Sequence, residues 1–180
     1  MIKSKTVAII PARLESSRLP RKALSNICGL PMIVHVFKRC EHAESLDDVF
    51  VATDSKEIQQ VVEQNGGKVI MTHNNHNCGS NRVAEAVQNI SCDIVINVQG
   101  DEPLVYPEHV DRIVETIKND IDIKCAVGYT SFTKKNSPSD IKAVLDLNEN
   151  IIYCSRTDLP SDAYSSIEKM KKLCFIVAFR

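Results

Sequence analysis

Short apolar segments alternate with amphipathic segments through the first two thirds of the chain. The apolar segments predict strands buried on both faces, and they are Thr6–Ile10, Val49–Thr53, Lys68–Thr72 and Asp93–Val98. Between and after them, apolar residues recur three and four positions apart, as in Val110, Ile113, Val114 and Ile117, which predicts helices. This strand–helix alternation predicts an α/β fold with a mostly parallel sheet and helices on both faces.

Local signals mark where the predicted helices begin and end. Pro31 is favoured at a first helical position, Asp54-Ser-Lys-Glu57 resembles a capping box, and Ser80 is a plausible N-cap for a third helix. Gly66-Gly67 is typical of a helix end. The connections are therefore short, as a doubly wound sheet requires.

The pattern changes after about Lys124. Lys124–Phe132 and Ile141–Leu147 are predicted strands, and Ile151–Ser155 returns from the turn Asn148–Asn150 as a hairpin. We therefore expect an α/β core over residues 1–123 and a smaller subdomain over residues 124–180, both within one structural domain.

Composition narrows the class of protein. The 180 residues suit one domain, and 22 basic against 23 acidic side chains argue against a surface that binds nucleic acid throughout. The apolar run after the N-terminus is too short for a membrane span or a signal peptide. The 7 cysteines have neither disulfide nor zinc spacing. We expect reduced, mostly buried thiols in a cytoplasmic protein with no membrane partner.

The loop after the first strand concentrates positive charge. Pro11–Lys22 holds Arg13, Arg18, Arg21 and Lys22 against the single acid Glu15. Such a loop at the carboxyl end of a strand suits a polyphosphate, although a solvated basic loop is an equally good interpretation. It lacks the P-loop pattern, and no GxGxxG follows the strand, so a dinucleotide-binding oxidoreductase is disfavoured.

Two further loops carry candidate chemistry. Asp101 and Glu102 follow the fourth strand, where a carboxylate can hold Mg²⁺ together with substrate phosphates; capping the next helix or facing solvent is the alternative. Thr72–Arg82 is polar and holds His73 and His76 without a third ligand at zinc spacing. It is better interpreted as lining a base or sugar pocket, with Arg82 reaching a phosphate or a hydroxyl.

These loops together resemble a known family. ARLESSRLPRKAL, NHNCGSNRVAEAV, IVINVQGDEPLVYPE and IKAVLDLNENIIYCSR are similar to motifs of the 3-deoxy-manno-octulosonate cytidylyltransferases (CMP-Kdo synthetases), and the likeness runs from about residue 6 to residue 160. The resemblance implies a three-layer Rossmann-like nucleotide-diphospho-sugar transferase fold with a sugar-binding and dimerisation subdomain. It also implies transfer of CMP from CTP to Kdo with release of pyrophosphate, in cytoplasmic lipopolysaccharide or capsule synthesis, with Mg²⁺ as cofactor.

The resemblance also assigns roles to residues. Arg13, Lys22 and Asp101 match catalytic positions, and Asp101 matches the metal ligand. Gln99 and Arg156 match sugar-binding positions. The nucleotide-binding positions are Pro11, Ala12, Arg13, Ser16, Arg18, Lys22, Thr72, Gly79 and Arg82.

Several residues depart from the family pattern. Arg21 stands in place of a glycine, where it would add a phosphate contact or clash, and Asn81 stands in place of an acidic residue. Leu173 and Phe175 replace a histidine and a glycine near the sugar. Family members continue beyond the last strand into segments for the dimer interface and a second metal ligand, so the subdomain is expected to be incomplete and the family homodimer is in doubt. The alternatives are a truncated or degenerate homologue that binds CTP without turnover, and a synthetase for another sugar acid.

Overall fold

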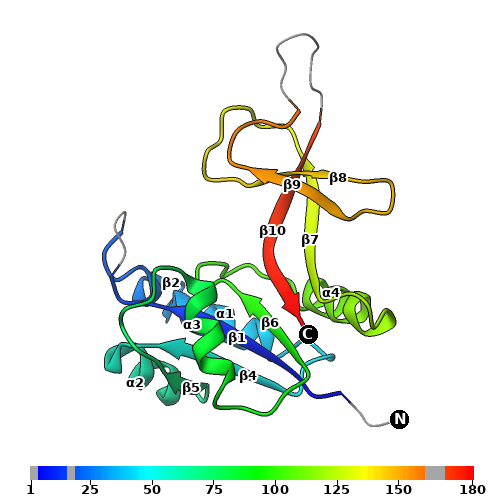
Figure 1. Ribbon diagram of the computed structural model, residues 1–180. Coiled ribbons are helices and arrows are strands. Elements are labelled where there is room, and N and C mark those ends of the chain that lie inside the picture. The colour runs from blue at the N-terminus through cyan, green and yellow to red at the C-terminus, as the bar shows by residue number, and fades with distance from the viewer. Residues whose placement is uncertain (1–3, 16–18, 161–168) are drawn as a thin grey trace. The chain divides into compact units, whose positions relative to one another are not determined.

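The structure, a computed structural model, describes residues 4–15, 19–160 and 169–180 (Figure 1). Two compact units are present: residues 1–126 with 175–180, and residues 127–174. The first unit contains β1 (Thr6–Ala12), the 3-10 turn η1 (Lys22–Leu24), β2 (Asn26–Ile27), β3 (Leu30–Pro31), α1 (Met32–Cys40), β4 (Asp48–Thr53), α2 (Lys56–Gln64), β5 (Lys68–Met71), α3 (Gly79–Val87), β6 (Ile94–Val98) and α4 (Pro107–Asn119). β7 (Cys125–Phe132), β8 (Lys142–Leu145), β9 (Ile151–Ser155) and β10 (Met170–Phe179) follow.

The sheet of the first unit has the strand order β5-β4-β1-β6-β10. The strands from β5 to β6 run parallel to their neighbours, and β10 pairs with β6 in the antiparallel sense, with Ile176 opposite Val98. The four strands predicted from apolar runs are all present. The last six residues belong to this unit, because the second half of β10 forms its edge beside β6.

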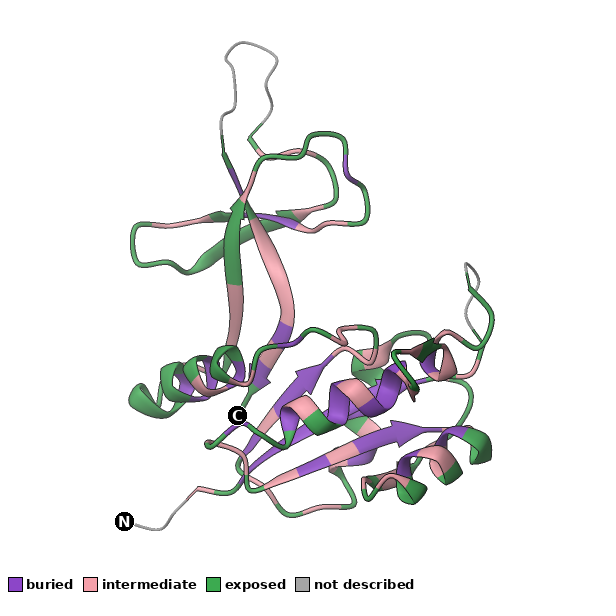
Figure 2. Cartoon of the chain, turned by 180° about the vertical axis from the view of Figure 1, so that it is seen from behind, coloured by how far each residue is buried: buried purple, intermediate pink, exposed green. Residues whose placement is uncertain are grey.

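Helices cover both faces of this sheet, as the sequence predicts. Alternate residues of β1 enter two different cores: Ala8 and Ile10 pack in the core that holds residues of α1, α2 and α4, and Val7 and Ile9 pack with Val83 of α3. Every residue of β1 is buried, and Figure 2 shows buried residues along β1, β4 and β6, whereas the edge strand β5 has none. A strand covered on both faces needs apolar side chains on both, which explains the continuous run TVAII.

Three predicted helix starts are wrong by one or two residues. Pro31 is the N-cap of α1, which begins at Met32. α2 is capped by Ser55, whose hydroxyl accepts from the N–H of Ile58 at 3.3 Å, and not by Asp54. α3 begins after Cys78, which is extended at φ −148° and ψ 165°, and not after Ser80. The carboxylate of Asp54 forms an ion pair with Arg82, so a tertiary contact takes the side chain that local capping rules assigned to the helix.

The second unit contains the predicted hairpin. β8 and β9 pair in the antiparallel sense, with Lys142 opposite Ser155. Asp146 closes their turn by accepting from the N–H groups of Asn148 and Asn150, each at 2.8 Å. The side chain of Asn150 and these N–H groups lower the pKa of Asp146. β10 pairs with β8 in the same sense, with Lys171 opposite Ala143.

The cysteines are free thiols, but the expectation that most are buried is wrong. Cys40 is buried in α1, and burial raises the pKa of its thiol to about 12. Four others are exposed, namely Cys28, Cys78, Cys125 and Cys154.

No helix within the described residues has the length and apolar character needed to cross a membrane.

Candidate functional site

Three chain segments converge at the carboxyl ends of β1 and β6. A Cβ atom on Gly100, just after β6, would lie 2.7 Å from the carbonyl oxygen of Pro11 in β1. A Cβ atom on Gly79, at the start of α3, would lie 3.2 Å from the Pro11 ring and 3.5 Å from Oε1 of Gln99. Glycine is needed at position 100, where two backbones approach this closely, whereas the neighbours of Gly79 are side chains. Pro11 and Gly79, which the resemblance assigned to nucleotide binding, and Gln99, which it assigned to sugar binding, therefore lie close together.

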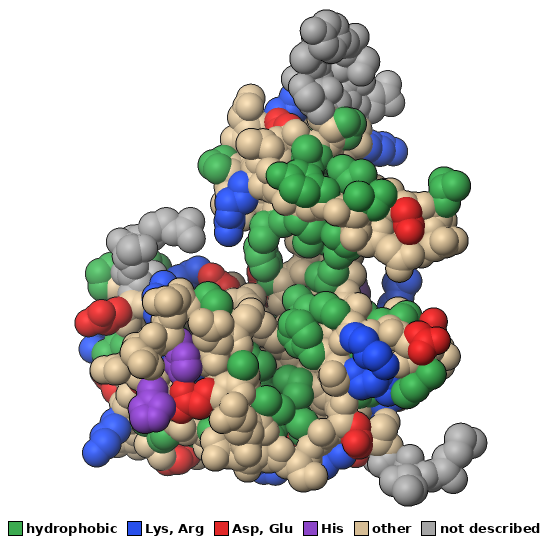
Figure 3. Space-filling view, viewed as in Figure 1, with side chains coloured by type: hydrophobic (Ala, Val, Ile, Leu, Met, Phe, Trp, Pro, Cys, Tyr) green, Lys and Arg blue, Asp and Glu red, His purple; other side chains and the backbone are tan. Residues whose placement is uncertain are grey.

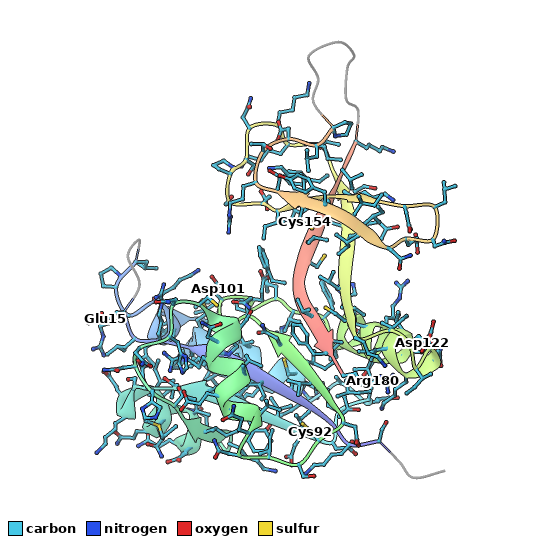
Figure 4. The ribbon with its side chains drawn as sticks, viewed as in Figure 1. Glu15, Cys92, Asp101, Asp122, Cys154 and Arg180 are labelled. Carbon is cyan, nitrogen blue, oxygen red and sulfur yellow. The ribbon has the colours of Figure 1, made fainter. Side chains whose placement is uncertain are left out.

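Lys22 and Asp101 join the basic first loop to the acidic loop after β6. Nζ of Lys22 lies 2.7 Å from Oδ2 of Asp101, and the two side chains are 37% and 48% exposed. Figure 4 shows Asp101 at the end of β6 opposite to Cys92. An ion pair this exposed contributes about 0–1 kcal/mol. A phosphate can therefore bind Lys22, and a cation can bind Asp101, at little cost from separating the pair.

The structure places only some of the other residues assigned in the first loop. Arg13 directly follows β1 and is exposed, and Pro11 and Ala12 are buried in the end of the strand. Ser16 and Arg18 lie outside the described residues. The backbone N–H of Arg21 closes the base of the loop by donating to Leu14 at 3.1 Å.

Arg21 shows what happens at the position where the resemblance expects glycine. Its φ of 58° lies in the left-handed region that favours glycine, so the backbone keeps that shape despite the larger residue. Its guanidinium forms an ion pair with Glu57 of α2. The charge of Arg21 is therefore partly neutralised by Glu57, as that of Lys22 is by Asp101, and both pairs are exposed enough for an anionic ligand to compete.

Arg82 is buried and held by protein groups. It is 4% exposed; its Nη1 donates to the hydroxyl of Thr72 and to the carbonyl of His73, and its Nη2 lies 3.2 Å from Oδ2 of Asp54. Thr72 and Arg82 thus contact each other, and together they fasten the loop after β5 to α3. Their contact with a nucleotide stays a prediction.

Glu85 is a residue of this region that the sequence reasoning missed. From α3 its carboxylate accepts from the backbone N–H of His73 at 3.0 Å and pairs with the ring of His76. Histidine and acidic side chains lie next to each other on this face of the first unit (Figure 3). Glu85 could have been found in the sequence from its position three residues after Arg82, on the helix that follows the loop with the two histidines. Among the described residues, no three His, Cys, Asp or Glu side chains gather as metal ligands.

The carboxylate of Glu85 should make the stability of this loop depend on pH. Partial desolvation raises the pKa of Glu85, but the N–H of His73 and the ring of His76 outweigh it and lower the pKa from its usual 4.5. A folded-state pKa below the unfolded value stabilises the fold at higher pH, and that stabilisation is lost as pH falls through the folded pKa. The Tm advantage of wild type over Glu85→Gln should therefore shrink between about pH 5 and about pH 2. Glu115→Gln, on the exposed side of α4, controls for the loss of one charge; a Tm difference for Glu85→Gln that is constant with pH would contradict the prediction.

The two assigned sugar-binding residues belong to different units. Gln99 is half-buried; its Nε2 donates to Oδ1 of Asn97 at 3.2 Å, and its backbone N–H donates to Phe175 of β10 at 3.4 Å. Arg156, in the second unit, is exposed, and its Nη1 donates to the carbonyls of Pro138 and Ser139 at 2.9 and 3.1 Å. Both side chains are thus oriented by protein acceptors, and Gln99 lies beside Gly79.

The residues present fit Mg²⁺ by their donor chemistry. Mg²⁺ is commonly held by one or two carboxylates together with substrate phosphates and water. Asp101 offers an accessible carboxylate at the end of a strand, and its partner there is the single ammonium group of Lys22. An Asp101 carboxylate released from Lys22 is a suitable ligand of this kind.

Comparisons with known proteins identify relatives of this chain. Residues 7–177 match the family described as Cytidylyltransferase. The 3-deoxy-manno-octulosonate cytidylyltransferase of Escherichia coli is 36% identical over 98% of this chain and 73% of its own length. That of Pelobacter propionicus is 42% identical over 85% of this chain and 61% of its own length. The solved structure of a CMP:2-keto-3-deoxy-manno-octonic acid synthetase complexed with CTP is similar with a TM-score of 0.93 and 36% identity, over 98% of this chain and 74% of that one. The chain thus spans about three fifths to three quarters of the length of these relatives, and its fold is the Rossmann-like nucleotidyltransferase fold.

Proposed function

This chain belongs to the cytidylyltransferase family, with the 3-deoxy-manno-octulosonate cytidylyltransferases as its relatives, and on that premise we propose that it transfers CMP from CTP to Kdo and releases pyrophosphate. The observation that carries the proposal is the Lys22–Asp101 pair at the carboxyl ends of β1 and β6. Lys22 supplies a cation for the triphosphate, and Asp101 supplies a carboxylate for the metal ion that accompanies it. The pair lies at the edge where open α/β sheets bind ligands. The product is an activated sugar acid for lipopolysaccharide or capsule synthesis, in the cytoplasm where CTP is available.

The proposed reaction is an in-line displacement at the α-phosphorus of CTP by a sugar hydroxyl. It depends on positioning and on neutralising charge more than on covalent catalysis. Lys22 and Arg13 offset the negative charge that builds on the departing pyrophosphate. Gln99 orients the sugar, and Arg156 binds the carboxylate of the sugar acid with its planar guanidinium.

Asp101 is the residue that would hold Mg²⁺. When bound, Mg²⁺ supplies neutralisation of charge on the phosphate oxygens. Asp101 also holds the ammonium group of Lys22 in place before the nucleotide arrives. The close approach of Gly100 to Pro11 keeps the loops that carry these two residues together.

Lys22→Ala should weaken CTP binding in a salt-dependent way. The variant loses a charge-assisted hydrogen bond to a phosphate, and we expect the Kd for CTP to rise by about tenfold or more at low salt. Because salt screens the lost attraction, the ratio of the two Kd values should fall as the salt concentration rises. Isothermal titration calorimetry at several salt concentrations measures both effects. Lys118→Ala, an exposed lysine of α4, is the matched control, and a Lys22→Ala effect that ignores salt would argue against a phosphate contact.

A further inference from the structure

Lys142, in β8, is a charged residue without exposed surface. Its relative exposure is 0%, and burying an ammonium group costs several kcal/mol unless hydrogen bonds and a counter-charge offset it. Nζ donates to the carbonyls of Ser137, Asp140 and Arg156 at 2.7, 3.0 and 2.6 Å. An ammonium group has three donors, so all three are used.

These bonds join two segments that are separate in the sequence. One is the loop over residues 137–140, and the other is the segment after β9 that carries Arg156. A carboxylate supports the junction, because Oδ1 of Asp158 lies 3.5 Å from Nζ of Lys142 and Oδ2 of Asp158 accepts from the N–H of Asn136 at 2.8 Å. Lys142 is therefore the centre of a small polar cluster within the second unit.

Arg156 is held by this cluster at both ends. Its backbone carbonyl accepts from Lys142, and its guanidinium donates to Pro138 and Ser139 in the loop that Lys142 also holds. Both guanidinium bonds use Nη1. Nε and Nη2 take no part in them, and this pair of nitrogens has the geometry to bind the two oxygens of a carboxylate.

Stability alone is a weak explanation for such a residue. Replacing a buried ionic group by an apolar side chain of similar volume is often neutral or stabilising. What an apolar side chain lacks is the ability to order three carbonyls around one point, and those carbonyls belong to Arg156 and to the loop that orients it. The need for three hydrogen-bond donors at one point thus explains the presence of a lysine at position 142 better than a contribution to stability does.

We propose that Lys142 is a positioning residue that fixes Arg156 for contact with the carboxylate of the sugar acid. The inference rests on the proposed function, since that function makes Arg156 a substrate contact. Lys142 itself touches no substrate, because its side chain is enclosed.

Steady-state kinetics of Lys142→Met, with Kdo and CTP varied in turn, test the proposal. We expect the KM for Kdo to rise by about 10–100-fold, while the Kd for CTP changes by less than about twofold. Arg156→Ala should show the same pattern, and the double variant should be no worse than Arg156→Ala alone, since both changes remove one interaction. Lys171→Met is the matched control: it removes an exposed lysine of β10 whose ammonium group lies over the Tyr129 ring, away from the 137–140 loop and Arg156. An unchanged KM for Kdo, an equal rise in Lys171→Met, or additive effects in the double variant would overturn the proposal.

Two further measurements keep the proposal open to refutation. If Lys142→Met fails to fold, Asp158→Asn is the variant to measure. It removes the counter-charge and keeps an oxygen for the N–H of Asn136. It should also raise the KM for Kdo, and no rise overturns the proposal.

If the wild type shows no turnover, the proposed function fails by itself. The Nε–Hε NMR signal of Arg156 then tests the positioning alone: it should be sharp in wild type and broadened in Lys142→Met or Asp158→Asn, and an unchanged signal overturns the inference.

Discussion

Asp101→Asn is expected to lower kcat for pyrophosphate release by about 10²–10³-fold, the usual cost of removing a group that stabilises transition-state charge. The substitution keeps the shape of the side chain and removes its charge. Lys22 then loses the carboxylate that holds its Nζ at 2.7 Å, and the site loses its proposed ligand for Mg²⁺. Steady-state rates at saturating CTP and Kdo measure the effect.

A binding measurement separates this loss from general damage. With Mg²⁺ removed by a chelator, Asp101→Asn should bind CTP as tightly as wild type or more tightly, because a negative charge beside the triphosphate is gone. Asp122→Asn makes the same charge change at an exposed position after α4 (Figure 4), and it should keep the wild-type kcat. Full activity in Asp101→Asn would refute the assigned role.

Gly100→Ala is expected to damage both stability and activity. The new Cβ would lie 2.7 Å from the carbonyl oxygen of Pro11. That oxygen belongs to a central strand and cannot rotate away, so the two loops must separate. We expect the free energy of unfolding to fall by about 1–3 kcal/mol and kcat/KM to fall by about 10²-fold, the effect of a displacement near 1 Å between reacting groups.

Gly79→Ala is the graded comparison for stability. Its Cβ would meet the Pro11 ring at 3.2 Å, a side-chain contact that a small shift relieves. Alanine also favours the first turn of α3 by up to about 1 kcal/mol over glycine. Urea unfolding should therefore show a clear loss for Gly100→Ala and little or none for Gly79→Ala. Equal losses would mean that the contact with Pro11 is not what limits these positions.

The fold was largely predictable because one physical rule covers most of it. Strands buried on both faces need continuous apolar runs, and TVAII and its counterparts show this directly. The proximity of the basic and acidic loops was also predictable from the sequence. Parallel strands bring their carboxyl ends to one edge of the sheet and so place Lys22 near Asp101. Local signals were less reliable at helix starts, where Ser55 caps α2 and Cys78 precedes α3.

Contacts between distant residues were not predictable from local patterns. Asp54 resembled a helix cap, but it pairs with Arg82, 28 positions later in the chain. Nothing in IKAVLDL marked Lys142 as buried, because the alternation of a strand does not say which polar residue finds acceptors. Arg21 was ambiguous for the same reason: its partner, Glu57, comes from another element.

Pyrophosphate release from CTP in the presence of Kdo and Mg²⁺ tests directly whether the chain is a working cytidylyltransferase. Purified protein is expected to release pyrophosphate and form a CMP-linked sugar acid in equal amounts, with neither product when Kdo is omitted. Release with a different sugar acid in place of Kdo would keep the transfer chemistry and change the substrate. If no pyrophosphate forms with any sugar acid at high enzyme concentration while CTP still binds, the proposal that this chain is a working cytidylyltransferase is contradicted.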